Sequence, residues 1–85
     1  MVSDVPKYRF EFREDFAEET LDSIELDDDE SARREAIRTA KEIMADGILE
    51  GLDRTGWASR VYNEAGQVVA TVKFSDLVEK RGYLK

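Results

Sequence analysis

The 85-residue sequence contains no cysteine and no histidine. Without cysteine there is no disulfide framework, no thiolate nucleophile and no sulfur-bound zinc. Without histidine the chain lacks the commonest general base and metal ligand. The sequence also lacks an 18-residue apolar run and the basic and apolar regions of a signal peptide. These absences predict a cytoplasmic protein with no membrane span.

Catalytic motifs are missing as well. The serines and threonines have no histidine to activate them, and neither a Gly-x-Ser-x-Gly elbow nor a phosphate-binding glycine loop occurs. The acids Asp27 to Glu30 lack the spacing and the internal glycine of an EF-hand loop, so helix capping explains them better than Ca²⁺ or Mg²⁺ binding. We therefore predict no catalytic residues, no metal site, no cofactor and no enzymatic activity.

The charge is high but unevenly distributed. Hydrophobic residues make up 41% and charged residues 39% of the chain, which leaves enough apolar side chains for one core. We predict a single domain over residues 1–85, with a loose lead-in at 1–6, a folded core at 7–78 and a frayed end at 79–85. The net charge is −7, and residues 14–30 hold ten acids and no base. We call this segment the acidic arm.

Alternating and helical patterns predict the elements. From Lys7 the aromatic residues Tyr8, Phe10 and Phe12 alternate with polar residues, as in a half-buried strand. After an acidic connection at 14–20, residues 21–26 form a short second strand. Eight small or apolar residues then recur at spacings of three and four, which predicts a helix with one buried stripe. They are Ala32, Ala36, Ile37, Ala40, Ile43, Met44, Gly47 and Ile48.

The ends of this helix carry their own signals. Asp28 or Asp29 can cap its start, and Gly51 is suited to its end. Gly47 lies in the apolar stripe, where the absence of a side chain would let the helix approach a sheet closely. Leu49 lies off the stripe and has no core role.

A hairpin of residues 57–62 and 67–74 follows, joined by an Asn63-Glu64-Ala65-Gly66 turn. A helical turn starts at Ser75. The order ββαββ predicts an α+β fold with two layers, one amphipathic helix on one face of a mostly antiparallel four-stranded sheet. The predicted core combines both periodicities and consists of Phe10, Phe12, Ile37, Ala40, Ile43, Met44, Val61, Val68, Ala70 and Val72.

Several of these segments carry a family resemblance. They are Tyr8-Arg9-Phe10-Glu11-Phe12, Glu25-Leu26 before an Asp-capped helix with Ala32 and Ala36, the Asn63–Gly66 turn, and Phe74-Ser75-Asp76-Leu77. With them, the run from Ser23 to Val78 resembles a family of short bacterial proteins of unknown function, best known from rhizobia and other alphaproteobacteria. Glu11 stands where relatives often carry histidine, and Ser23 where they often carry glycine. The resemblance implies the architecture and a bacterial origin, and it brings no activity.

Two surfaces are candidates for binding. The side of the sheet away from the helix is expected to carry bases and one tyrosine, with Val69 and Thr71 among its other residues. The candidate binding residues there are Arg9, Arg13, Arg60, Tyr62 and Lys73. Such a face can bind single-stranded nucleic acid, can be shielded by its own long side chains, or can receive the acidic arm from its own chain or a partner.

The exposed side of the helix is the second candidate. Basic residues followed by acids would be self-complementary if two helices met antiparallel. The candidate interface residues are Arg34, Arg38, Lys41 and Leu49. We predict a protein-binding or homo-oligomeric module whose partner is an unknown protein or a second copy. The alternative is a weak nucleic-acid-binding or antitoxin-like regulatory module that uses the sheet face, although the acidic charge of the chain disfavours nucleic acid.

Overall fold

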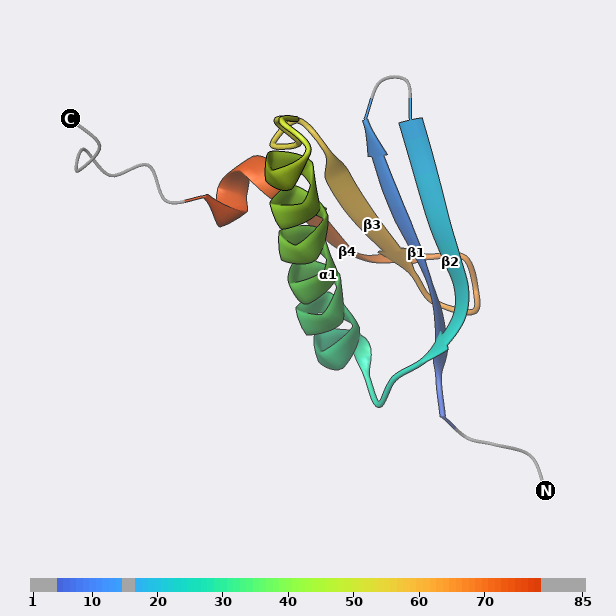
Figure 1. Ribbon diagram of the computed structural model, residues 1–85. Helices are drawn as coiled ribbons and strands as arrows, with labels where there is room; N and C mark the ends of the chain where they lie inside the picture. The colour runs from blue at the N-terminus through green and yellow to red at the C-terminus, as the bar shows by residue number, and fades with distance from the viewer. Residues whose placement is uncertain (1–4, 15–16, 79–85) are drawn as a thin grey trace.

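The computed structural model describes residues 5–14 and 17–78 of the chain. The elements are β1 (Lys7–Glu14), β2 (Ala17–Glu25), α1 (Asp29–Leu49), β3 (Ala58–Tyr62), β4 (Val68–Lys73) and the 3₁₀ turn η1 (Phe74–Leu77). The strands form one antiparallel sheet in the order β2-β1-β3-β4, and α1 crosses one face of it (Figure 1). The predicted two-layer ββαββ fold is confirmed. The predicted frayed end and residues 1–4 of the lead-in lie outside the described residues.

The core lies between α1 and the inner face of the sheet. Alternation along β1 buries Tyr8, Phe10 and Phe12, as the aromatic pattern predicts. Of the other predicted core residues, Ala40, Val61 and Val72 are buried, while Ile37, Ile43, Met44 and Ala70 are partly buried against the core. Helix α1 packs mainly on β3, β4 and η1, and less on β1. Most of β2 therefore lies beyond the part of the sheet that the helix covers, although its Ile24 packs against the core.

The prediction for Val68 and Val69 is wrong. Val68 is 51% exposed, and Val69 packs against the core. Tyr62 pairs with Val68 and Val61 pairs with Ala70, so β4 has one extra residue at this point. Because such a bulge interrupts the period of two, the side chains before it change faces.

The strand β2 is longer than predicted. It begins at Ala17, so most of the predicted acidic connection is strand, paired with β1 along its length. Pairing with a neighbouring strand has overridden the low strand propensity of its acids. The register shifts by one residue between the pairs Tyr8–Ile24 and Phe10–Leu21, and Ser23 lies in this shift with a φ of 59°. This left-handed conformation favours glycine.

Both ends of α1 are capped. The Asp28 carboxylate accepts a hydrogen bond from the Ser31 backbone N–H at 2.7 Å, which confirms the predicted capping by one of the two aspartates. At the other end Gly51 has a φ of 81°, and the N–H of Leu52 donates to the carbonyl of Gly47 at 2.7 Å. This is a Schellman ending, as the predicted stop at Gly51 requires.

Two helix predictions need correction. A Cβ on Gly47 would lie 2.9 Å from the Arg54 Cδ, so Gly47 makes room for an arginine and not for the sheet. Ile48, predicted in the buried stripe, is 73% exposed. It lies about 100° around the helix from the buried Gly47, at the edge of the stripe.

The β3–β4 hairpin matches its prediction to within one residue at each strand end. The Asn63 Oδ1 accepts hydrogen bonds from the N–H groups of Ala65 and Gln67, and Gly66 has a φ of 82°. The predicted helical turn is present as η1. In the described part of the chain, no helix combines the length and apolar character needed to cross a membrane.

Candidate binding surfaces

The outer face of the sheet carries all five residues predicted there. With Phe10 and Phe12 pointing inward, Arg9 and Arg13 point outward from β1. Tyr62 lies opposite Arg9, Arg60 lies two positions before Tyr62 on β3, and Lys73 follows at the same face of β4. The four bases are exposed, and Tyr62 is half-buried.

These side chains are largely engaged with one another. The Arg9 guanidinium lies 4.4 Å from the centre of the Tyr62 ring, and the Tyr62 hydroxyl donates to the Glu11 Oε1 at 3.3 Å. The same Glu11 oxygen lies 3.7 Å from the Arg13 Nη1. Contact with Tyr62, and to a lesser extent the charge of Glu11, raises the pKa of Arg60. Glu11 therefore joins the three arginines and the tyrosine into one network.

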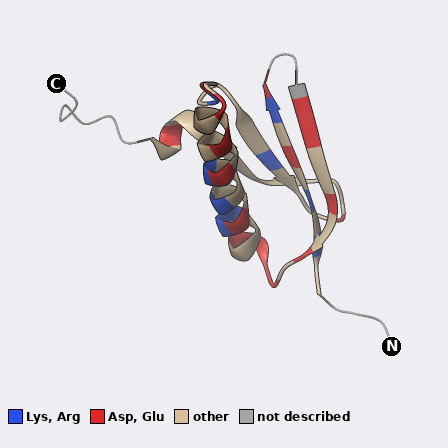
Figure 2. Ribbon diagram, in the orientation of Figure 1, with Lys and Arg blue, Asp and Glu red and all other residues tan. Residues whose placement is uncertain are grey.

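The acidic arm supplies the acids along the edge of this face. Its central part is β2, which pairs with β1 and places Glu25 opposite Lys7 and Glu18 opposite Arg13. Figure 2 shows acidic segments on this edge strand. Opposite charges on directly paired residues stabilise a sheet. Within residues 17–25, the acidic arm thus lies beside the basic face of its own chain.

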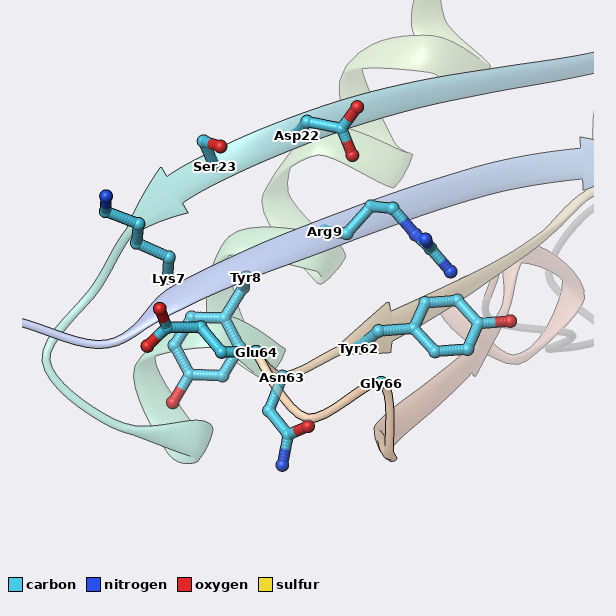
Figure 3. Close-up of a pocket in the computed structure, with 9 residues that line it drawn as sticks. All are labelled: Lys7, Tyr8, Arg9, Asp22, Ser23, Tyr62, Asn63, Glu64 and Gly66. Atoms are coloured by element: carbon cyan, nitrogen blue, oxygen red, sulfur yellow. The ribbon is translucent and has the colours of Figure 1, made fainter.

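A shallow hollow of about 440 Å³ lies at one end of this face. Figure 3 shows Arg9 on β1 extending toward Tyr62, with Asp22 on the neighbouring β2. The hollow is lined by Lys7, Tyr8, Arg9, Asp22, Ser23, Tyr62, Asn63, Glu64 and Gly66. Its cations and carboxylates are mixed, so it offers no concentrated charge of one sign to a ligand.

Tyr8 makes a contact that the sequence pattern did not predict. Its buried hydroxyl donates to the Asp29 Oδ1 at 2.7 Å, joining β1 to the first turn of α1. Burial, followed by the hydrogen bond to Asp29, raises the pKa of Tyr8 to about 12. Alternation predicts the inward direction of Tyr8, but only the chain path after β2 brings Asp29 to it.

Two of the bases on α1, Arg34 and Arg38, are paired within the helix. Arg34 lies 3.5 Å from Glu30, and Arg38 forms ion pairs with Glu35 and Glu42. The hydrogen bond from Arg38 is the main cause of the lowered pKa of Glu35. Of the predicted interface residues, Lys41 forms no ion pair with any described residue. Leu49 is 85% exposed.

Exposed apolar side chains gather at the end of α1. We call this set the apolar patch; it consists of Ile48 and Val78, which line one groove, and of Leu49 and Leu52, which follow Ile48 at the end of the helix. This groove has a volume of about 330 Å³. The groove is lined by Lys41, Met44, Ala45, Ile48, Asp53, Arg54, Thr55 and Val78. Leu49 is predicted from the sequence to lie here, whereas Leu52, Val78 and the exposure of Ile48 are not.

Arg54 fixes one wall of this groove. Its Nη1 donates to the Ile43 carbonyl at 3.2 Å, and its guanidinium lies 5.6 Å from the centre of the Trp57 ring and 3.6 Å from Glu50. The side chain crosses α1 at Gly47, where a larger residue would collide with it. The groove is therefore held by packing as well as by the loop backbone.

Within residues 5–14 and 17–78, no three His, Cys, Asp or Glu side chains are grouped so that they could hold a metal ion. Asp28 and Asp53, which have lowered pKa values, are engaged mainly by backbone N–H groups of Ser31 and Thr55. Both carboxylates serve local structure.

Comparisons with known proteins give one result. Neither the curated proteins nor the solved structures include a significant match. The model of one protein family matches residues 7–75, which takes in all four strands and the helix. The chain belongs to this family, which is described as a domain of unknown function (DUF6894).

Proposed function

We propose that this chain is a small, non-enzymatic protein-binding or homo-oligomeric assembly module that acts through the apolar patch. The observation that carries the proposal is the exposure of Leu49 and Ile48, at 85% and 73%, beside an apolar groove. Adjoining exposed apolar side chains are typical of surfaces that bind another protein. The resemblance of its sequence supports a bacterial origin, and we propose the cytoplasm, which the sequence analysis predicts, as its location.

Binding of a partner at the apolar patch costs less free energy than binding at the outer face of the sheet. A partner that covers Leu49 and Leu52 removes apolar surface from water, and no existing contact has to be broken. A partner on the sheet face must compete with the contacts that Arg9, Glu11 and Tyr62 already make with one another. Binding at the patch therefore has the smaller cost.

The same contacts give little support to the alternative of a weak nucleic-acid-binding or antitoxin-like module. Base stacking needs a free aromatic face, and the ring of Tyr62 is stacked against Arg9. The acids of β2 also flank the basic residues. Salt-sensitive binding of single-stranded RNA or DNA that is lost in Arg9→Ala and Arg60→Ala would favour this alternative.

Affinity capture from the lysate of the native host tests the proposal. We expect the wild-type chain and the sheet-face control Arg9→Ala to retain the same specific protein, and Leu49→Asp to lose it. Leu49 is almost fully exposed, so its replacement should leave the melting temperature unchanged. Retention by Leu49→Asp together with loss in Arg9→Ala would contradict the proposal and place binding on the sheet.

A further inference from the structure

The apolar patch has a projecting part and a hollow part. Leu49 projects from the last turn of α1, and the adjoining groove is lined by Met44, Ala45 and Ile48 of the same helix. In a two-fold interface the same surface meets itself, so each projection needs a hollow on that same surface. The patch meets this condition without help from any other region.

Near the apolar patch, negative charge at the end of α1 lacks a basic partner, and one basic residue, Lys41, lacks an acidic one. The last turn of α1 has no basic residue to offset the negative end of the helix dipole, and Asp46 adds to it, whereas Glu50 is paired with Arg54. Lys41 borders the groove and forms no ion pair with the described residues. Of the bases nearer the helix start, Arg34 and Arg38 are already paired with Glu30, Glu35 and Glu42. Arg33 forms no ion pair with the described residues, but it lies eight residues before Lys41 and does not line the groove.

The spacing of these features defines an arrangement. Lys41 and Leu49 are each four residues from Ala45, an exposed small residue that permits close approach of two helices. If two α1 helices cross antiparallel near Ala45, each Lys41 reaches the last turn of the other helix. A parallel arrangement would instead place acid beside acid.

We infer that the partner of the apolar patch is a second copy of this chain, bound about a two-fold axis near Ala45 with the two α1 helices antiparallel. The inference rests on the proposed function, because it names the partner of the same patch. In this dimer the exposed Leu49 of each chain enters the groove of the other. The outer face of the sheet stays exposed on both chains.

Sedimentation of the purified 85-residue chain over a range of concentrations tests the dimer. We expect the mass to rise from 9.7 kDa to twice that value. Leu49→Asp should weaken the dimer by about 10-fold or more. Lys41→Glu should weaken it to a smaller extent, while the control Lys41→Arg preserves it. A mass of one chain throughout, or a dimer insensitive to Leu49→Asp, would overturn the inference.

Because the chain has no cysteine, a single introduced cysteine tests the orientation. Ala45→Cys lies near the axis and should form a disulfide between chains under mild oxidation. Arg34→Cys should not, because in the antiparallel dimer the two copies lie roughly 30 Å apart along the helices, at 1.5 Å per residue. Efficient cross-linking of both variants would indicate parallel helices and contradict the arrangement.

The outcomes separate this inference from the proposed function. A monomer whose Leu49→Asp variant loses a captured host protein would overturn the dimer and leave the protein-binding proposal standing. A monomer that also captures the same proteins with and without Leu49→Asp would overturn both.

Discussion

The half of the sheet that α1 covers and the half that it leaves open depend on different interactions. Under the helix, β1, β3 and β4 contribute Phe12, Val61 and Val72 to a core closed by Phe74. Beyond it, β2 pairs with β1 through the backbone and places Glu25 and Glu18 opposite Lys7 and Arg13. On its inner side Ile24 packs against the core, but Leu21 is 46% exposed. Apolar burial thus stabilises one half, and strand pairing with charge complementarity stabilises the other.

The same contrast separates the two exposed surfaces. The outer face of the sheet has many charges, but Glu11 and β2 compensate most of them within the chain. The end of α1 has fewer charges, but its apolar side chains remain in water. The number of charged residues alone would therefore favour the outer face of the sheet as the binding surface. The side chains that lack interactions within the chain are instead the exposed apolar residues at the end of α1.

The largest expected effect comes from the covered half. Phe12→Ala should lower the free energy of unfolding by about 3–5 kcal/mol, because it leaves a cavity in the core. The matched change in the open half, Leu21→Ala, should cost less than about 1 kcal/mol. Urea denaturation measures both values. Similar losses at the two positions would show that the helix does not divide the sheet as described.

The pH dependence of the melting temperature measures how much the titrating groups contribute to stability. The pKa of Asp28 is lowered mainly by the Ser31 N–H, so its contribution is present above the unfolded pKa and lost as the pH falls through the folded one. The raised pKa of Tyr8 gives a contribution that is present below pH 10 and lost as the pH rises toward about 12. The melting temperature should therefore fall at both extremes.

Two variants test which residue causes the fall in melting temperature in acid and which causes the fall in alkali. Asp28→Asn keeps a good capping residue but removes its titration, so the decline in acid should become shallower. Tyr8→Phe should flatten the decline in alkali. EDTA should have no effect at any pH, and a large stabilisation by millimolar Ca²⁺ would contradict the capping interpretation of Asp27 to Glu30.

A smaller effect is expected at Ser59, which is fully buried in the covered half. Its hydroxyl has no hydrogen-bond partner among the described residues. Ser59→Ala removes an unsatisfied polar group from the core and should raise the free energy of unfolding by about 1 kcal/mol. Ser59→Thr, which keeps the hydroxyl and adds a methyl group, should give no gain. A loss of stability in Ser59→Ala would show that the hydroxyl is bonded in solution.

The open half contains a defect of similar kind at Ser23. The left-handed backbone there is strained for a residue with a Cβ, and Ser23→Gly should gain about 0.5 kcal/mol after the added flexibility of glycine in the unfolded chain. Ser23→Ala keeps the Cβ and serves as the control. Equal stability of the two variants would show that backbone strain is not the reason why relatives often carry glycine at this position.

Periodicity predicted the parts of the fold that depend on neighbours in sequence. The aromatic face of β1, the Asp28 cap, Gly51 and the Asn63–Gly66 turn follow from local patterns, and the structure confirms them. The bulges at Ser23 and Val69 break the period of two, which no residue nearby signals. The predicted second strand is too short because acids have low strand propensity. Only pairing with β1 explains why β2 starts at Ala17.

The candidate sites show the same limit. The outward bases could be predicted from alternation alone, but their pairing with Glu11 and β2 depends on strand order. Leu49 could be predicted to be exposed because it lies outside the apolar stripe of the helix. Arg54 and Val78 join it only through the path of the chain after α1, so the groove had no counterpart in the sequence pattern.

An amide chemical-shift series of the purified chain compares the two surfaces directly, from low micromolar to millimolar concentration. The account predicts concentration-dependent shifts at Lys41, Ala45, Leu49 and Leu52, with the amides of Arg9 and Arg60 unchanged. The shifts should disappear in Leu49→Asp. Shifts confined to the outer face of the sheet, or none at the end of α1 at the highest concentration, would contradict the claim that the unmet interactions of this fold lie on the helix and bind a second copy.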